Sequence, residues 1–269
     1  MTNGIQASGI ENGAREPPAE VDVFQNDAAA SQSLNWAATR KFQKIFGNQA
    51  VRSYLYMSLG MGVLAFMLPI ALLAAGGYPD HFSISYFYHV SDLSRNILVG
   101  SLWATGIFLF LFQALSRVEN WLLNVAGLAA ISVAMNPMPS DQCGNGGGFS
   151  LHGASAVVFF LCLAIVAIGF SKKRIQYIIY PPKRLWFKRA YDVAGFAMIA
   201  MPAAVFALHL QGERQCESHW IFWVETFGIW AFSFYWFVKT KEYKTLLRIR
   251  WFASQREREW AKEGLQESA

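Results

Sequence analysis

One acidic residue, Glu225, lies inside a long apolar stretch, WIFWVETFGIWAFSFYWFV, at residues 220–238. A carboxylate in a membrane helix is costly unless it is paired or wetted. We therefore predict that Glu225 faces the interior of a helix bundle or a cavity. Its functional interpretation is a general acid or base, or an anchor for a ligand. The structural alternative is an ion pair with Arg95 or a hydrogen bond to a tyrosine.

All five histidines lie at or near the ends of apolar stretches, on the side that we assign to the outer face of the membrane. They are His81, His89, His152, His209 and His219. Histidine changes its charge near neutral pH and is suited to proton transfer. We predict that these loops share one polar pocket. Unrelated loop residues are the alternative, because loops are polar in any protein.

The predicted pocket assigns a role to each residue. Glu225 and His152 would transfer protons, and Tyr88 would orient the substrate or donate to developing charge. Arg95 would hold an anionic head group, since a guanidinium forks onto phosphate or carboxylate. The predicted catalytic residues are thus Glu225, His152 and Tyr88, and the predicted substrate-binding residues are Arg95, Ser83, Ser85, Tyr86 and His89.

Two other chemistries are weaker interpretations. No H-x-x-x-H or H-E-x-x-H pattern occurs, so we predict no metal site; one would require convergence of His81, His89, His152 and His219. A nucleophilic pair of His152 with Ser83, Ser85 or Ser150 lacks a G-x-S-x-G elbow. The sequence indicates no particular cofactor.

Two of the three cysteines, Cys143 and Cys216, fall in loops that we assign to the outer face. That compartment is oxidising in bacteria and in the secretory pathway. We predict a disulfide between them, and we expect Cys162, within an apolar stretch, to be a small packing residue.

The composition predicts the elements that must position these residues. Hydrophobic residues make 54% of the 269, and charged residues 15% against roughly 25% in a soluble domain. An ordinary water-soluble enzyme is thereby excluded. Six stretches approach the 20 or so apolar residues of a membrane helix. They are residues 54–75, 97–116, 121–138, 152–170, 191–210 and 220–238. We predict an all-α bundle of six transmembrane helices.

The basic residues predict its orientation. Lys and Arg near the ends of the six stretches gather on one side, whereas the other side holds only Arg95 and Arg214. By the positive-inside rule both termini face the cytoplasm. The net charge of +5 is then a topology signal, and no nucleic-acid partner is predicted. We expect a multi-pass protein of the cell membrane: a bacterial inner membrane, or an endomembrane in a eukaryote.

The chain divides into four predicted parts. Residues 1–33 read as a disordered cytoplasmic tail and residues 34–52 as a short juxtamembrane segment. Residues 53–238 form the transmembrane domain. Residues 239–269 read as a basic amphipathic cytoplasmic tail, either on anionic lipid or as a solvated helix.

The run SISYFYH at residues 83–89, followed by RNILVG at 95–100, resembles the S-x-S-x-[FY]-Y-[HT]…R-[DN]-x-[FL]-V-G signature of a family of small, uncharacterised bacterial membrane proteins. Further matches are residues 124–127, Asn136–Pro137, His152 and Glu225. The resemblance implies six helices with the marked residues on the outer side, and no particular activity. A distant likeness is to the alkaline ceramidase and progestin-receptor superfamily, which holds zinc in a seven-helix bundle; this chain has six predicted spans and no H-x-x-x-H in the last.

Together these features favour a membrane-embedded enzyme that acts on a lipid or other hydrophobic small molecule in a polar pocket open to the outer face. The main alternative is a transporter, channel subunit or sensor that only binds a ligand there; a scaffold for partner membrane proteins is a third. Membrane lipids and a hydrophobic ligand are the expected partners. The oligomeric state is left open, a homo-oligomer included.

Overall fold

A computed structural model describes residues 19–77, 83–114, 116–138, 150–172, 175, 181–210 and 220–267. Over these residues the chain consists of helices and their connections, without a strand. It divides into two units, Met1–Gln49 and Ala50–Ala269. The prediction of an all-α protein is confirmed.

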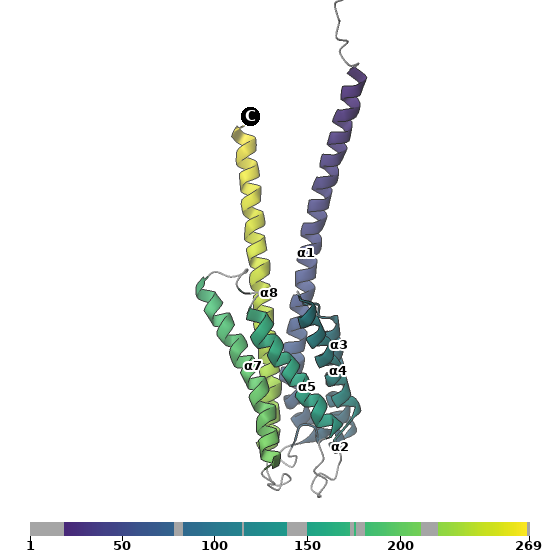
Figure 1. Cartoon of the computed structure of the whole chain (residues 1–269), viewed down its shortest axis with the longest axis vertical. Coiled ribbons are helices and arrows are strands. Elements are labelled where there is room, and N and C mark those ends of the chain that lie inside the picture. The colour runs from purple at the N-terminus through teal and green to yellow at the C-terminus, as the bar shows by residue number, and fades with distance from the viewer. Residues whose placement is uncertain are drawn as a thin grey trace, which may run out of the picture. The chain divides into compact units, whose positions relative to one another are not determined.

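The second unit holds the helices that surround the candidate site (Figure 1). Its first helix is the part of α1 that follows residue 49. In chain order the elements are α1 (Ala19–Gly76), α2 (Phe87–Val90), α3 (Asp92–Leu111), α4 (Arg117–Met135), α5 (Leu151–Ile165), the π-helix η1 (Val166–Ser171), α7 (Pro181–Leu210) and α8 (Trp220–Glu267).

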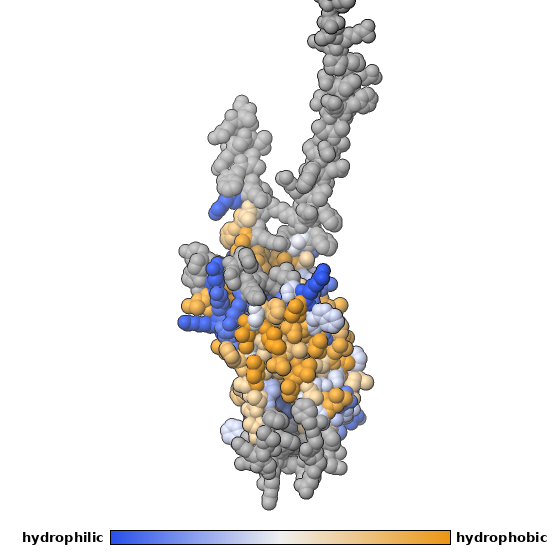
Figure 2. Space-filling model, in the orientation of Figure 1, coloured by the Kyte–Doolittle hydropathy of each residue, from blue (hydrophilic) through white to orange (hydrophobic). Residues whose placement is uncertain are grey.

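Five helical segments among the described residues are long and apolar enough to cross a membrane. They are Gln49–Gly76, Asp92–Leu111, Arg117–Met135, Leu151–Ser171 and Trp220–Ala253. Figure 2 shows their hydrophobic side chains as a broad orange surface with hydrophilic side chains along its upper border. The remaining predicted span, residues 191–210, belongs to α7. The structure does not describe several side chains at the end of this helix, so the sixth span stays a prediction.

The predicted N-terminal tail contains more helix than expected, whereas the C-terminal tail is helical as predicted. Residues 19–33, for which the sequence predicts disorder, belong to α1. The run of alanines at residues 28–30 gives this segment a high helix propensity, which its polar composition conceals. Residues 239–267, the predicted basic tail, continue α8 without a break.

Serine side chains begin three of the membrane helices. Ser91 caps α3 in a reciprocal capping box with Ser94. Ser116 accepts a hydrogen bond from the Glu119 backbone at the start of α4, and Ser150 accepts one from Gly153 at the start of α5. A serine oxygen at this position satisfies one of the backbone N–H groups that a helix start leaves unpaired.

Small residues bring helices close together. A Cβ atom at Gly127 of α4 would lie 2.8 Å from the backbone oxygen of Gly106 of α3. A Cβ atom at Gly62 of α1 would lie 2.9 Å from the ring of Phe237 of α8, and the Ser233 hydroxyl donates to the Gly62 carbonyl at 2.7 Å. These contacts resemble the small-residue interfaces of membrane helices.

A buried ion pair lies in α8, within a segment that the sequence assigns to a cytoplasmic tail. Lys239 and Glu242 are both fully buried, and their charged atoms are 3.4 Å apart. The Tyr191 hydroxyl of α7 donates to the same Glu242 oxygen, and the Lys239 ammonium lies over the Tyr191 ring. The packed core therefore extends past residue 238.

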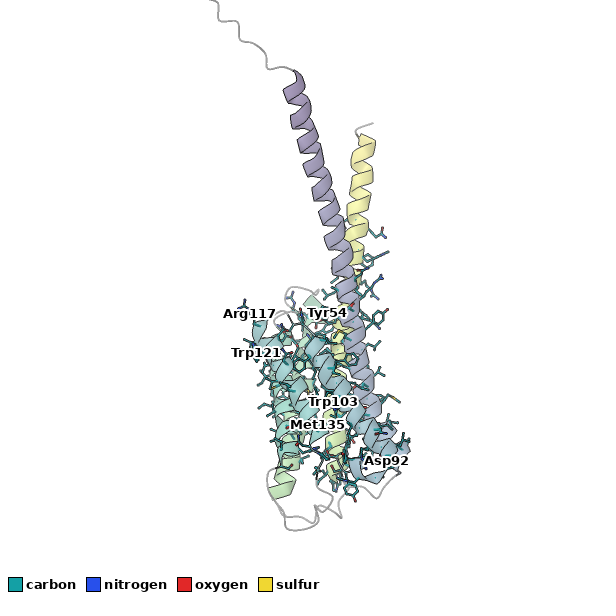
Figure 3. The ribbon with its side chains drawn as sticks, turned by 90° about the vertical axis from the view of Figure 1, so that its right-hand side faces the viewer. Tyr54, Asp92, Trp103, Arg117, Trp121 and Met135 are labelled. Atoms are coloured by element: carbon teal, nitrogen blue, oxygen red, sulfur yellow. The ribbon has the colours of Figure 1, made fainter. Side chains whose placement is uncertain are left out.

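The two predicted membrane faces lie at opposite ends of the second unit (Figure 3). Arg117, predicted for the inner face, is at one end and Asp92, predicted for the outer face, is at the other. Between them Trp103, Trp121 and Met135 point outward, with 38%, 71% and 62% of their surfaces exposed. Exposed apolar side chains at this level fit an environment of lipid.

Candidate functional site

The first part of the site is a turn at residues 83–86 that precedes α2. Helix α1 ends at Gly76, and the next residue, Gly77, has a φ of +78°, a left-handed conformation that suits glycine. In the turn, the Tyr86 amide donates to the Ser83 carbonyl at 3.3 Å, and the Phe87 amide donates to the Ile84 carbonyl at 3.2 Å.

Two apolar side chains fix this turn. Ile84 is 3% exposed and Phe87 is 1% exposed. They join a cluster with Leu68 of α1, Leu98 of α3 and Phe222 of α8. Burying a side chain of this size stabilises by roughly 1.5–3 kcal/mol, so the turn is held against three helices and its flanking serines have fixed positions.

Glu225 of α8 binds this turn. Its Oε2 atom accepts a hydrogen bond from the Ser83 hydroxyl at 2.8 Å and another from the Ile84 backbone amide at 2.6 Å. The Ser85 amide donates to the Ser83 hydroxyl oxygen at 3.1 Å. The carboxyl group therefore faces the bundle interior and contributes to the structure of the turn.

His152, in the first turn of α5, bridges the same turn and the end of α4. Its Nδ1 atom lies 2.9 Å from the backbone oxygen of Asn136, and its Nε2 atom lies 2.8 Å from the Ser85 hydroxyl oxygen. A carbonyl oxygen only accepts, so a neutral imidazole carries its proton on Nδ1. Nε2 is then the acceptor, and the Ser85 hydroxyl donates to it.

A serine hydroxyl that donates to an oriented imidazole is the arrangement that activates a nucleophile. The imidazole can take the hydroxyl proton as the oxygen attacks, and the Asn136 carbonyl holds the ring in the required tautomer. Of the three serines that the sequence offers as partners of His152, the structure pairs Ser85 with it. Ser150 instead caps α5, and Ser83 bonds Glu225.

A cavity of about 480 Å³ adjoins these groups. This is within the usual range for small-molecule sites. Most of its lining is apolar. Its polar lining residues are Ser83, Ser85, Tyr88, Ser101, Thr105, Ser150, His152 and Glu225. The cavity can therefore accommodate an apolar molecule that carries a polar group.

Five of the eight predicted site residues line this cavity: Ser83, Ser85, Tyr88, His152 and Glu225. They come from the turn, α2, α5 and α8. The sequence did not single out Ser101 and Thr105, which lie four residues apart on α3 and also line the cavity. Their i, i+4 spacing, which puts both hydroxyls on one helix face, is a signal that could have found them.

The other three predicted site residues do not line the cavity. Arg95 pairs with Asp92 at 2.9 Å, and its Nε donates to the Tyr88 carbonyl at 3.1 Å. His89 lies 2.7 Å from the Met138 carbonyl, and the ring of Tyr86 packs near that of His89. Arg95 is thus held outside the cavity by partners three and seven residues away, and His89 by a partner 49 residues away.

Several predictions concern residues outside the description: the disulfide of Cys143 with Cys216, and the pocket contributions of His81 and His219. Cys162 is free and buried in the core. In the described parts of the chain, no three side chains of His, Cys, Asp or Glu are close enough to hold a metal ion.

Comparison with models of protein families, with curated proteins and with solved structures found no match to this chain. The family resemblance drawn from the sequence stays a prediction. The interpretation of the site depends on its geometry.

Proposed function

We propose that this protein is an integral membrane enzyme that cleaves an acyl bond, such as an ester, in a lipid or other hydrophobic small molecule. The observation that carries the proposal is the Ser85–His152 pair, 2.8 Å apart beside a largely apolar cavity. The cavity supports a hydrophobic substrate, and the pair supports nucleophilic attack.

The proposed reaction has two balanced stages. The Ser85 oxygen bonds to the acyl carbon while its proton passes to His152 Nε2. The carbon–oxygen bond to the alcohol then breaks, and His152 returns the proton to the departing alcohol. Water next bonds to the acyl carbon of the acyl-serine and gives one proton to His152. The bond between the acyl carbon and the Ser85 oxygen then breaks, and His152 returns the proton to Ser85, which releases the acid and the free serine.

The remaining cavity residues take supporting roles in this proposal. Tyr88 would donate from its hydroxyl to the oxyanion that forms on the acyl carbon. Glu225 holds the turn through Ser83 and Ile84. The two stages above pass each proton through His152, and proton transfer by Glu225 is a separate proposal that turnover by Glu225→Gln tests. Arg95 supports Tyr88 through its backbone carbonyl and its ring, 5.1 Å from the guanidinium carbon.

The proposed setting is a cell membrane crossed six times, with residues 191–210 as the sixth span. Both termini are in the cytoplasm, and the site lies in the outer half. The basic residues of the inner loops support this orientation. Cysteines introduced at residue 92 and at residue 117 and treated with a membrane-impermeant maleimide test it: only the cysteine at 92 should react in intact cells.

A fluorophosphonate with a short alkyl chain tests the nucleophile. It forms a phosphorus–oxygen bond with an activated serine and releases fluoride, so mass spectrometry locates the reacting residue. We expect labelling at Ser85 in the full-length protein in nanodiscs, and at least a 100-fold lower rate in Ser85→Ala and His152→Gln. Ser53→Ala, at an exposed serine of α1 outside the cavity, is the control and should retain labelling.

Absence of labelling at Ser85, or labelling that survives His152→Gln, would rule out this enzyme. The same cavity would then serve a protein that only binds its ligand, as a transporter, channel subunit or sensor does. A molecule retained by the purified protein, without turnover, would support that alternative.

A further inference from the structure

A second hollow lies beside the site cavity, on the exterior of the helix bundle between α5 and α7. We call it the α5–α7 groove. Its volume is about 340 Å³, and it is lined by Val157, Phe160, Leu161, Met198, Ile199, Pro202 and Ala203. Every one of these residues is apolar.

The groove adjoins the site cavity, because three residues line both. Val157, Phe160 and Pro202 line both hollows. A Cβ atom at Gly228 of α8 would lie 3.6 Å from the tip of the Phe160 ring, so this ring reaches across to α8. Phe160 therefore stands at the junction of the cavity and the groove.

The groove faces the surroundings of the helices. The exposed fractions are 39% for Val157, 47% for Leu161 and 41% for Ile199. Val157 and Leu161 belong to a helical segment long and apolar enough to cross a membrane, and Ile199 belongs to α7. Pro202 lacks an N–H group, so α7 loses a backbone hydrogen bond at this level. Helix α7, which forms one wall of the groove, therefore has fewer backbone hydrogen bonds where the groove meets the cavity.

The geometry points to a membrane lipid with a long hydrocarbon chain as the substrate. Its polar, reactive end would lie at Ser85 and His152, and its chain would pass Phe160 into the α5–α7 groove. The molecule would enter sideways from the bilayer between α5 and α7. This inference rests on the proposed function and specifies its substrate class and route of entrance.

Ala203→Trp tests the route, because an indole at this exposed position would fill the groove. Ala200→Trp is the matched control: it is the same change on the same helix, also exposed, but outside both hollows. Two fluorophosphonates, one with an ethyl chain and one with a hexadecyl chain, are compared. We expect Ala203→Trp to slow the hexadecyl reaction at least 10-fold and the ethyl reaction less than 2-fold. Ala200→Trp should alter neither.

Equal hexadecyl rates in Ala203→Trp and the wild type would overturn the inference. If Ala203→Trp instead loses both reactions, a second variant decides. Phe160→Ala removes the ring at the junction and should raise the ratio of hexadecyl to ethyl rates at least 3-fold. An unchanged ratio would overturn the inference.

A readout without chemistry separates this inference from the proposed function. The proteins are incubated with vesicles of palmitoyl-oleoyl phosphatidylglycerol, purified, and examined by native mass spectrometry. We expect one retained lipid in the wild type and in Ala200→Trp, and at least 5-fold less in Ala203→Trp. If this pattern holds while Ser85 does not react, the route stands and the enzyme proposal fails. If Ser85 reacts but retention is equal in all three, the route fails and the enzyme proposal stands.

Discussion

The Ser85 hydroxyl oxygen and His152 Nε2 lie 2.8 Å apart, although 67 positions separate the residues in the chain. Neither belongs to a local motif that would bring the two together. Their contact is produced by the burial of Ile84 and Phe87, which positions the turn, and by the Ser150 cap, which begins α5 just before His152.

The first prediction separates the two roles of Glu225. Glutamine keeps an oxygen that can accept hydrogen bonds from Ser83 and Ile84. The free energy of unfolding of Glu225→Gln should therefore lie within about 1 kcal/mol of the wild-type value. Leucine leaves the Ile84 amide unpaired, so Glu225→Leu should lose about 1–3 kcal/mol. Thermal unfolding in detergent measures both.

Turnover adds a second measurement to the same variants. Glu225→Gln should retain fluorophosphonate labelling of Ser85, because labelling needs only the nucleophile and its base. It should slow ester turnover at least 10-fold if Glu225 transfers a proton. Normal turnover by Glu225→Gln would leave Glu225 with a positioning role only.

The second prediction concerns the ion pair that the sequence offers as an alternative. Arg95 contacts Asp92 and Tyr88, whereas Glu225 contacts Ser83 and Ile84. The double exchange Arg95→Glu with Glu225→Arg should therefore not rescue the loss caused by Glu225→Arg alone. Labelling of Ser85 measures the outcome, and rescue to wild-type rates would revive the direct pair.

The third prediction concerns the buried pair in α8. Removing one member leaves an unpaired charge in the core, so Lys239→Met should cost about 3–5 kcal/mol of unfolding free energy. Lys244→Met, on the exposed surface of the same helix, should change it by less than about 0.5 kcal/mol. Similar unfolding of the two variants would contradict the burial of Lys239.

The fourth prediction concerns the contact of α3 with α4. Gly127→Ala would put a methyl group 2.8 Å from the Gly106 carbonyl oxygen and 3.0 Å from the Phe110 ring, and should destabilise by roughly 1–3 kcal/mol. Gly100→Ala meets nothing within 4 Å and should be neutral or stabilising by up to about 1 kcal/mol. Unfolding midpoints of the two variants provide the comparison.

The sequence predicts those features that depend on the cost of exposing or burying a residue. Long apolar stretches announce the helices, and the expense of a carboxylate in lipid correctly indicates that Glu225 has polar neighbours. The same reasoning predicts that His152 and Glu225 share a pocket, because the sequence places both toward the outer face, and both line the cavity.

Partner choice was beyond the sequence, because it depends on geometry over a few ångströms. Arg95 had a local acid, Asp92, and a distant one, Glu225, and only the fold decides between them. The sequence places Lys239 and Glu242 in a basic tail, on lipid or in solvent, since their spacing does not reveal that Tyr191 contacts both. Ser85 was one of three equivalent candidates until the turn was placed.

The π-helix η1 has a consequence for the inner half of the bundle. Its wider turn advances the chain by one residue, about 100° of rotation. Ser171 thereby reaches back to the Val166 carbonyl and across to the Tyr235 hydroxyl, at 3.2 and 3.3 Å. Removing one amino acid from Val166–Ser171 would rotate the residues that follow by about 100° relative to those before, and this hydroxyl would lose both contacts.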